Sequence, residues 1–224
     1  MVARLIVQTI LWFGIMGAVL FLSAGTLNWP GAWAFLALMV ALSFTLGAWL
    51  ASRNPGLMNE RLGSPIQKDQ PVADKVLLSV LLLAVFAWLA LMGLDVRFGW
   101  TAVPAWLQLV GAFLLLLSIW ISSRTMLENS FAAPVVKIQE SRGQQVITTG
   151  PYSYVRHPMY AGAVLFFIGT ALLLGSWLGL ATVLVFVVLL VIRIHIEEKA
   201  LRGGLQGYGD YAARVRYRLI PLVW

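Results

Sequence analysis

The sequence contains no cysteine and few charged side chains. Of its 224 residues, 60% are hydrophobic and only 11% are charged. The absence of cysteine excludes a disulfide scaffold. A soluble domain usually has about 25% charged and about 45–50% apolar residues, so this much apolar surface cannot be buried in one soluble core. The composition therefore excludes an ordinary soluble globule and a disordered chain, and it predicts an all-α, polytopic membrane protein.

Six apolar runs are long enough to cross a bilayer, whose core is about 30 Å thick and needs roughly 20 apolar residues in a helix. The first run is too long for a signal peptide and a second follows at once, so we interpret it as a retained helix. None of the six contains Asp or Glu, which argues against an ion-coupled transporter. The predicted spans are Leu5–Gly25, Ala32–Ala51, Val76–Leu94, Val103–Ile121, Met159–Leu174 and Trp177–Ile192, the last two joined by a tight Gly175-Ser176 turn.

The basic residues predict an orientation. If the N-terminus is cytoplasmic, 15 of the 16 Lys and Arg residues, Lys68 included, lie in cytoplasmic segments. The exception is Arg97. Such asymmetry is the positive-inside pattern, so we expect both termini in the cytoplasm. The net charge of +7 is then explained by topology, with anionic lipids as neighbours, and no nucleic-acid partner is expected.

The residues suited to chemistry lie in the second half of the chain. Residues 1–122 hold four spans, and we interpret the loop 52–75 between them as a plain cytoplasmic connector. The candidate catalytic region, 123–224, comprises a cytoplasmic connector (123–157), two spans (158–194) and a tail (195–224). The connector is too long for a hairpin turn and contains apolar residues, which predicts an ordered segment at the membrane surface. The tail has Tyr and Arg at helical spacing. It either lies on the bilayer or folds back over a cytosol-facing site, and the predicted architecture uses the second placement.

The first chemical motif is Gly150-Pro-Tyr-Ser-Tyr-Val-Arg156-His157-Pro158-Met-Tyr-Ala-Gly162. Pro158 suits the first turn of a helix, because its missing N–H would be unpaired there anyway. Arg156 and His157 then lie at a positive helix end, which favours an anionic ligand group. The alternative is that Arg156 only obeys the positive-inside rule and His157 only caps the helix.

The second motif is Arg193-Ile-His195-Ile-Glu197-Glu198. Arg193 and Glu197 are four residues apart and share one helix face. A carboxylate pair at a membrane edge needs a partner, so the motif indicates either a site or an interfacial salt bridge. His195 does not share that face, and with two His and no Cys in the chain we predict no metal site.

Together these stretches resemble the isoprenylcysteine carboxyl methyltransferase family of integral membrane enzymes, in its bacterial branch. The resemblance covers about residues 140–224. It rests on the following elements: Gly150-x-Tyr152-x-x-x-Arg156-His157-Pro158-x-Tyr160-x-Gly162, Arg193-x-x-x-Glu197-Glu198, Tyr208-x-x-Tyr211, Arg214-Val215 and Pro221.

The resemblance implies S-adenosylmethionine as methyl donor, bound at the cytosolic edge by the last two spans and their flanking segments. The donor site it implies consists of Gln144, Val146, Ile147, Tyr152, His157, Tyr160, Glu197 and Glu198. Arg156, Arg193 and Glu197 would be catalytic, and the acceptor would be bound by Arg193, Tyr208, Tyr211 and Arg214. In this interpretation Glu197 faces the cationic end of the donor, and Arg193 faces an acceptor carboxylate.

The predicted function is methylation of the carboxylate of a lipid-like or isoprenylated small acceptor in a bacterial cytoplasmic membrane, with membrane lipids as partners. Three alternatives remain. One keeps the scaffold and methylates a phospholipid amine or a thiol. Another is reduction of a lipid with a nicotinamide cofactor. The last is a non-enzymatic membrane factor. The sequence does not predict the oligomeric state.

Overall fold

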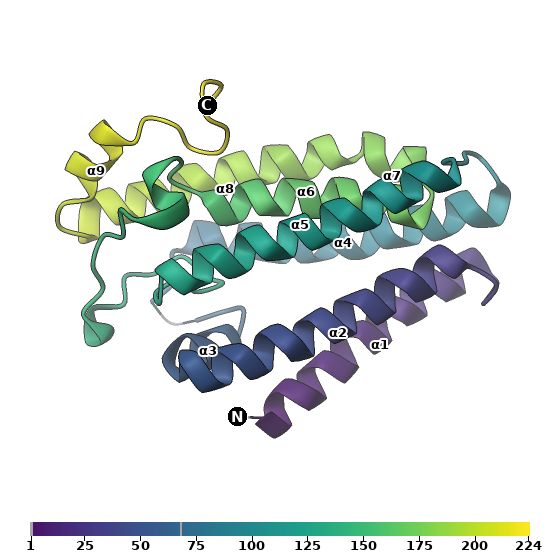
Figure 1. Cartoon of the computed structure of the whole chain (residues 1–224), viewed down its shortest axis with the longest axis horizontal. Helices are drawn as coiled ribbons and strands as arrows, with labels where there is room; N and C mark the ends of the chain where they lie inside the picture. Colours follow the sequence, from purple (N-terminus) through teal and green to yellow (C-terminus); the bar gives the residue numbers. More distant parts are fainter. Residues whose placement is uncertain (1, 68) are drawn as a thin grey trace.

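The computed structural model describes residues 2–67 and 69–224, and these are helical with no strand. Lys68, counted above toward the predicted orientation, lies outside the described residues. The elements, drawn in Figure 1, are α1 (Val2–Ala24), α2 (Pro30–Arg53), α3 (Pro55–Arg61), α4 (Val72–Phe98), α5 (Ala105–Glu128), the short 3-10 turns η1 (Glu140–Arg142) and η2 (Gly150–Ser153), α6 (Pro158–Leu174), α7 (Trp177–Ala181), α8 (Val183–Gly204) and α9 (Tyr208–Arg214).

The first five predicted apolar runs each correspond to one helix, whereas the sixth is divided at Thr182 into α7 and the first part of α8. The all-α prediction is confirmed for the described residues. Within residues 2–67 and 69–224, five helical segments are long and apolar enough to cross a membrane: α1, α2, α4, α5 and the combined segment Trp177–Gly204. Helix α6 is apolar but has only 17 residues. Six spans and cytoplasmic termini therefore stay predictions.

The local signals at both ends of α6 are confirmed. Pro158 is the first residue of the helix, where proline fits without loss of a hydrogen bond. Gly175 ends the helix with φ of +83°, a left-handed conformation that favours glycine. The Ser176 hydroxyl then accepts a hydrogen bond from the Gly179 N–H and starts α7.

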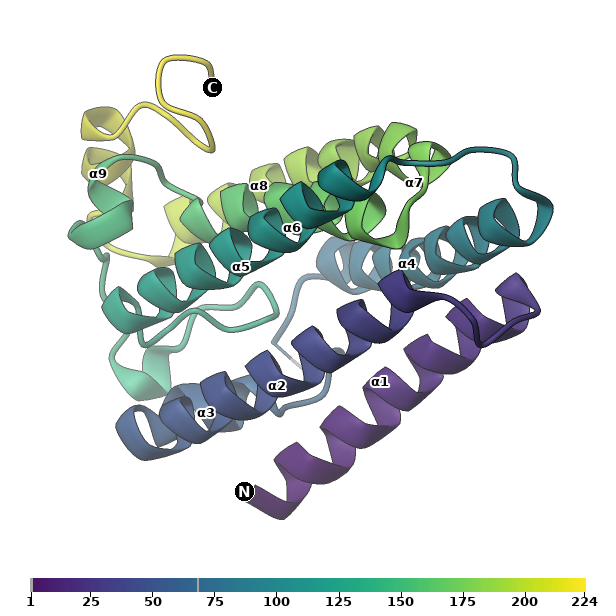
Figure 2. The same cartoon turned by 45° about the vertical axis from the view of Figure 1, so that its right-hand side comes forward.

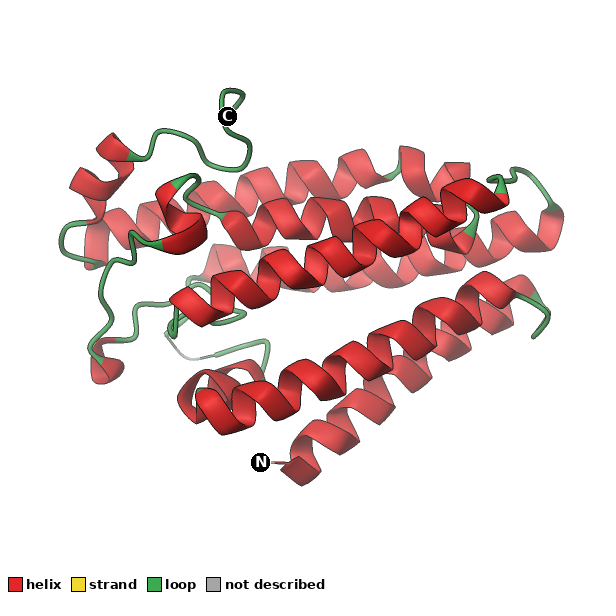
Figure 3. Ribbon diagram, viewed as in Figure 1, coloured by secondary structure: helices red, strands yellow, loops and turns green. Residues whose placement is uncertain are grey.

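The helices lie side by side along one long axis. Helix α1 packs against α2 and α4, and α5 packs along α6; Figures 1 and 3 show these neighbours in the same view. Gly111 and Gly169 allow α5 and α6 to approach closely: a Cβ on Gly111 would lie 2.5 Å from the Leu173 N, and one on Gly169 would lie 2.7 Å from the Gly111 O. In Figures 1 and 2 the N-terminus, α3 and α9 lie at the same end of the bundle.

Three aromatic side chains form the centre of the core. Phe167 of α6 stacks on Phe186 of α8 with ring centroids 4.2 Å apart, and Trp88 of α4 packs edge-on against both. The Trp88 indole N–H donates to the Gly179 O at 2.8 Å. This cluster joins α4, α6 and α8 and supports one wall of the cavity described below, which Phe167 also lines.

Several helices extend beyond the predicted spans, and the additional turns hold buried acids. Helix α4 encloses Asp74 and Asp95, whose exposed fractions are 0% and 1%. Asp95 accepts hydrogen bonds from the hydroxyls of Thr101 and Ser176 at 2.6 and 2.5 Å. The apolar sequence pattern ends at the first charged residue. The helix itself continues past that residue where the charged side chain forms hydrogen bonds or ion pairs with other groups of the protein. The loop 52–75, predicted to be a plain connector, thus contains α3 and the buried Asp74.

Candidate active site

A cavity of about 330 Å³ lies where the connector, α6, α8 and α9 meet. That volume is at the lower end of the range for small-molecule sites, roughly 300–1,000 Å³. Of the predicted site residues, those that line it are Gln144, Val146, Ile147, Tyr152, Arg156, His157, Tyr160, Arg193, Glu197, Tyr208 and Tyr211. Glu198 and Arg214 are not among the lining residues.

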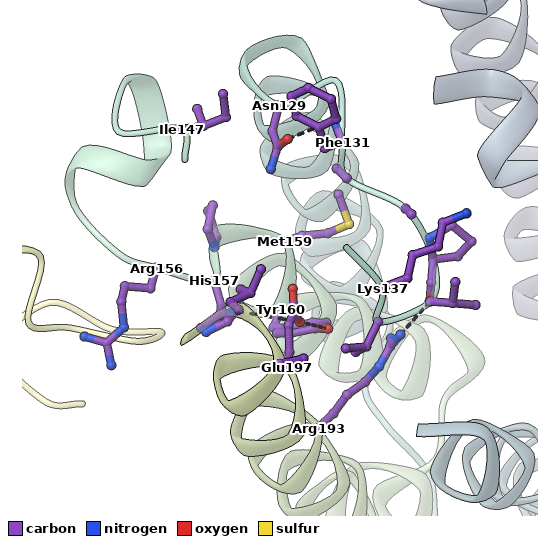
Figure 4. Close-up of a pocket in the computed structure, with 18 of the residues that line it drawn as sticks. Asn129, Phe131, Lys137, Ile147, Arg156, His157, Met159, Tyr160, Arg193 and Glu197 are labelled. Atoms are coloured by element: carbon purple, nitrogen blue, oxygen red, sulfur yellow. Dashed lines mark hydrogen bonds and ion pairs between the residues drawn. The ribbon is translucent and has the colours of Figure 1, made fainter. Parts of the chain in front are cut away.

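Glu197 contributes a carboxylate to the cavity wall, close to Tyr160 and His157 (Figure 4). Its Oε2 accepts the Tyr160 hydroxyl at 2.5 Å and lies 3.9 Å from His157 Nδ1. The His157 ring stacks on Tyr160 with centroids 5.5 Å apart. The Glu197 side chain keeps 29% of its surface exposed, and it is the one acidic residue lining the cavity in the described part of the chain. Glu197 is thus placed to meet a cationic ligand group.

Arg156 and Glu198 form a buried ion pair beside the cavity. Arg156 Nε lies 2.7 Å from Glu198 Oε1, and both side chains are more than nine-tenths buried. The Arg156 guanidinium also donates to the Val215 O at 2.7 Å and the Arg216 O at 2.9 Å. Arg156 therefore joins α8 to the tail. Its predicted catalytic role stays a prediction, as does the donor-binding role of Glu198.

The backbone strengthens this connection. The N–H groups of Arg156 and His157 donate to the Tyr217 O and the Arg218 O, each at 2.9 Å. Arg218 adds a contact of 3.2 Å from Nη2 to Glu198 Oε2. The segment after α9 thus packs against the start of α6. Arg214, at the end of α9, is exposed, so its predicted role toward an acceptor stays a prediction.

Arg193 is held by an acidic residue that sequence reasoning missed. Arg193 Nε lies 3.1 Å from Asp74 Oδ1, and Nη2 donates to the Pro134 O at 2.5 Å. Asp74 Oδ2 accepts the Val136 N–H at 3.0 Å. Asp74 therefore joins α4, the connector and α8. The signal available in the sequence was an acid just before a long apolar run, and it gave no hint of a partner 119 residues away.

Three tyrosines close the cavity on the α9 side. The Tyr211 hydroxyl donates to the Tyr152 O at 2.8 Å, and Asn129 Nδ2 donates to the Tyr152 hydroxyl at 2.8 Å. Burial raises the pKa of Tyr211 to about 12 and also raises the pKa of Tyr152 and Tyr208. All three phenols are therefore neutral hydrogen-bond donors at pH 7. Asn129 was not predicted, since nothing in the linear sequence relates it to Tyr152.

The Tyr208 hydroxyl is buried at the cavity wall and has no hydrogen-bond partner in the described part of the chain. A buried polar group without a partner is costly, so a ligand group that bonds this hydroxyl would relieve the cost.

Tyr208→Phe is expected to weaken binding of S-adenosylhomocysteine about tenfold, the effect of one lost hydrogen bond. The same change is expected to leave unchanged or raise the melting temperature of the ligand-free protein, because it removes an unsatisfied hydroxyl. Calorimetric titration and thermal unfolding in detergent measure the two effects.

Tyr211→Phe is the matched control. Its hydroxyl is already used by the Tyr152 O, so this variant should lose stability instead of gaining it. Full affinity in Tyr208→Phe would contradict a ligand contact at this hydroxyl.

The connector supplies the remaining predicted donor residues. Gln144 Oε1 accepts the Gln139 N–H at 2.7 Å and so holds the turn around η1. Val146 packs with Tyr208 and Tyr211. Ile147, labelled in Figure 4, also lines the cavity. In residues 2–67 and 69–224 no group of three or more His, Asp or Glu is arranged to hold a metal ion.

The chain is similar to known proteins in sequence and in fold. Residues 106–206 match the family model described as phospholipid methyltransferase. The chain is also similar to a solved structure of the eukaryotic intramembrane Ras methyltransferase, isoprenylcysteine carboxyl methyltransferase. The TM-score is 0.52 at 22% sequence identity, over 97% of this chain and 86% of that one. No curated protein gave a significant match.

The family match includes most of the cavity-lining residues of the connector, α6 and α8, and the structural similarity shows the fold of the whole chain. Together they support a membrane methyltransferase. They also confirm the resemblance to the isoprenylcysteine carboxyl methyltransferases that the two motifs predicted.

Proposed function

We propose that the chain is an S-adenosylmethionine-dependent methyltransferase that acts at the cytosolic membrane interface and methylates the carboxylate of a lipid-like or isoprenylated small acceptor. The observation that carries the proposal is that Glu197 and Arg193 lie on one face of α8 and both line a single cavity. The segment that holds them matches the phospholipid methyltransferase model.

The cavity has the groups that such a donor requires. Glu197 offers a partly exposed carboxylate for a cationic end, and the N-terminal end of α6 at His157 favours an anionic end. Tyr208 offers a hydroxyl without a partner, and Val146 and Ile147 offer an apolar wall. When bound, S-adenosylmethionine supplies a methyl group on a sulfonium centre. These residues would hold it.

The contribution of the protein is then mainly positioning. Transfer of a methyl group needs donor and acceptor in line, and such alignment supplies roughly 7–11 kcal/mol of a barrier. Arg193 has five N–H donors; Asp74 and Pro134 hold its guanidinium through Nε and Nη2. The remaining donors would bind an acceptor carboxylate in an orientation that Asp74 sets.

A second candidate is methylation of a phospholipid amine, which the name of the matching family, phospholipid methyltransferase, favours. A neutral amine needs a carboxylate that accepts its proton, and not an arginine. Glu198 is paired with Arg156 and Arg218 and does not line the cavity, so it is not placed to serve as that carboxylate. Glu197, the one carboxylate among the cavity-lining residues in the described part of the chain, accepts the Tyr160 hydroxyl and would face the donor. Arg193, and not a second carboxylate, is then left for the acceptor, which favours the carboxylate acceptor.

Arg193→Ala is expected to lower methylation of a farnesylcysteine acid about 100-fold or more. The variant removes the proposed partner of the acceptor carboxylate, and truncating one partner of a buried charged pair costs about 2–5 kcal/mol. Phosphatidylethanolamine serves as the amine acceptor in a parallel assay. Both use radiolabelled S-adenosylmethionine and protein in phosphatidylcholine nanodiscs.

The double variant Asp74→Ala/Arg193→Ala is the control for fold, since it leaves no buried charge unpaired. It should bind S-adenosylhomocysteine like wild type and still fail to methylate the acid. Normal methylation of the acid by Arg193→Ala would remove Arg193 from the acceptor site. Methyl transfer to phosphatidylethanolamine alone would establish the amine candidate instead.

A further inference from the structure

A second hollow lies beside the candidate site. A groove of about 630 Å³ runs between α1, α2 and α3, a size typical of sites that hold one small molecule. Its walls are mainly apolar and include Leu5, Trp12, Ile15, Leu46, Leu50 and Met58. Helices α1 and α2 are both apolar enough to cross a membrane, so the bilayer supplies molecules with apolar tails to this groove.

Arg61 connects this groove to the site, because it lines both cavities. It is the last residue of α3, and Nη1 donates to the Ala132 O at 3.1 Å. None of the described carboxylates lies within 4 Å of it; its neighbour Glu60 is paired with Lys137 at 2.6 Å. Burial lowers the pKa of Arg61, as expected for a cation that has lost water without gaining a counter-charge.

The other two arginines that line the site cavity are already neutralised. Arg156 is paired with Glu198 and Arg193 with Asp74. Arg193 can therefore add hydrogen bonds to a ligand, whereas Arg61 supplies uncompensated positive charge. A partly buried cation of this kind is stabilised by an anion that approaches from either cavity.

We propose that Arg61 binds the anionic head of a single-chain amphiphile whose apolar tail occupies the groove between α1, α2 and α3, and that this amphiphile is the methyl acceptor. The second part rests on the proposed function. Because Arg61 lines both cavities, an acid that it holds would lie at the entrance of the cavity in which Arg193 would orient the carboxylate for transfer. The charge of Arg61 then selects an anionic head over a neutral one, and the groove selects one apolar chain.

The test uses two photoactivatable probes, a diazirine-labelled palmitic acid and the corresponding alcohol, with the full chain in phosphatidylcholine nanodiscs. Crosslinked peptides are mapped by mass spectrometry. Wild type should be labelled by the acid on the α1 and α2 walls of the groove, at least tenfold more than by the alcohol. Arg61→Gln should reduce labelling by the acid about tenfold, the effect of one charge-assisted hydrogen bond, and leave the alcohol unchanged.

Arg53→Gln is the matched control, because Arg53 is exposed at the end of α2 and lines neither cavity. It should be labelled like wild type. Ser43→Phe would place a ring in the groove from α2 and keep Arg61 in the chain, and it should abolish labelling by both probes. Equal labelling by acid and alcohol, or unchanged labelling of Arg61→Gln by the acid, would overturn the proposal.

Two further arms separate this proposal from the proposed function. Excess phosphatidylglycerol should not displace the acid; efficient displacement would make the groove a site for bilayer lipid and overturn the assignment of the acceptor. Arg61→Gln should bind S-adenosylhomocysteine like wild type. If wild type itself fails to bind S-adenosylhomocysteine, the proposed function and the identity of the acceptor fail together, while the crosslinking result still decides whether Arg61 holds an anionic head.

Discussion

Glu197→Ala is expected to abolish calorimetrically detectable binding of S-adenosylhomocysteine to the detergent-purified protein, whereas wild type is expected to bind with micromolar affinity. Among the predicted changes, this one has the largest effect on affinity. Glu197 is the one carboxylate among the cavity-lining residues in the described part of the chain. Losing the partner of a desolvated cationic group costs about 2–5 kcal/mol, or roughly 30-fold to several thousand-fold in affinity. His157→Ala is expected to lose binding as well, since it removes the ring that stacks on Tyr160 beside Glu197.

Two variants control this experiment. Glu140→Ala removes an exposed carboxylate of the connector that does not line the cavity, and it should bind like wild type. Glu197→Gln keeps the shape and can still accept the Tyr160 hydroxyl, so its loss of affinity measures the charge alone. Absence of binding to folded, monodisperse wild type would contradict the proposed donor. Normal binding by Glu197→Ala would remove Glu197 from the donor site.

The second large effect concerns the buried pair beside the cavity. Arg156→Ala is expected to lower the free energy of unfolding by about 3–5 kcal/mol, because it removes the nearer and more deeply buried of the two arginines paired with Glu198 and leaves this carboxylate with His157 and Arg218. The substitution also removes the donors to the Val215 O and the Arg216 O. Thermal unfolding in detergent measures the first loss. Limited proteolysis after α9 measures the second, since a released tail is cleaved faster.

Arg216→Ala is the matched control for charge, because Arg216 is exposed on the same tail and should leave unfolding unchanged. The double variant Arg156→Ala/Glu198→Ala removes both buried charges and should recover part of the lost stability. A melting temperature of Arg156→Ala equal to that of wild type would show that the pair does not hold the tail.

The sequence by itself was sufficient for the long apolar helices, although not for α3, and for the part of the chain that holds most of the polar residues suited to chemistry. An apolar run of about 20 residues becomes helical in lipid because every backbone group must be satisfied within the segment, whatever its neighbours are. The start of α6 at Pro158 and its end at Gly175 follow from equally local properties, a missing N–H and a positive φ. Arg193 and Glu197 could be predicted to share a face because four residues make about one helical turn.

Only the tertiary structure decided which polar groups meet. Asp74 and Arg193 are 119 residues apart in the sequence, Arg156 and Glu198 are 42 apart, and nothing local in either partner identifies the other. Arg61 could not be identified from the sequence for the same reason. Its proposed role in binding an anionic head depends on its position between two cavities and on the absence of a nearby carboxylate among the described residues. Helical periodicity determines which way a side chain points along its own helix. The charge that it meets there depends on how distant helices pack, and that packing energy is a property of the whole fold.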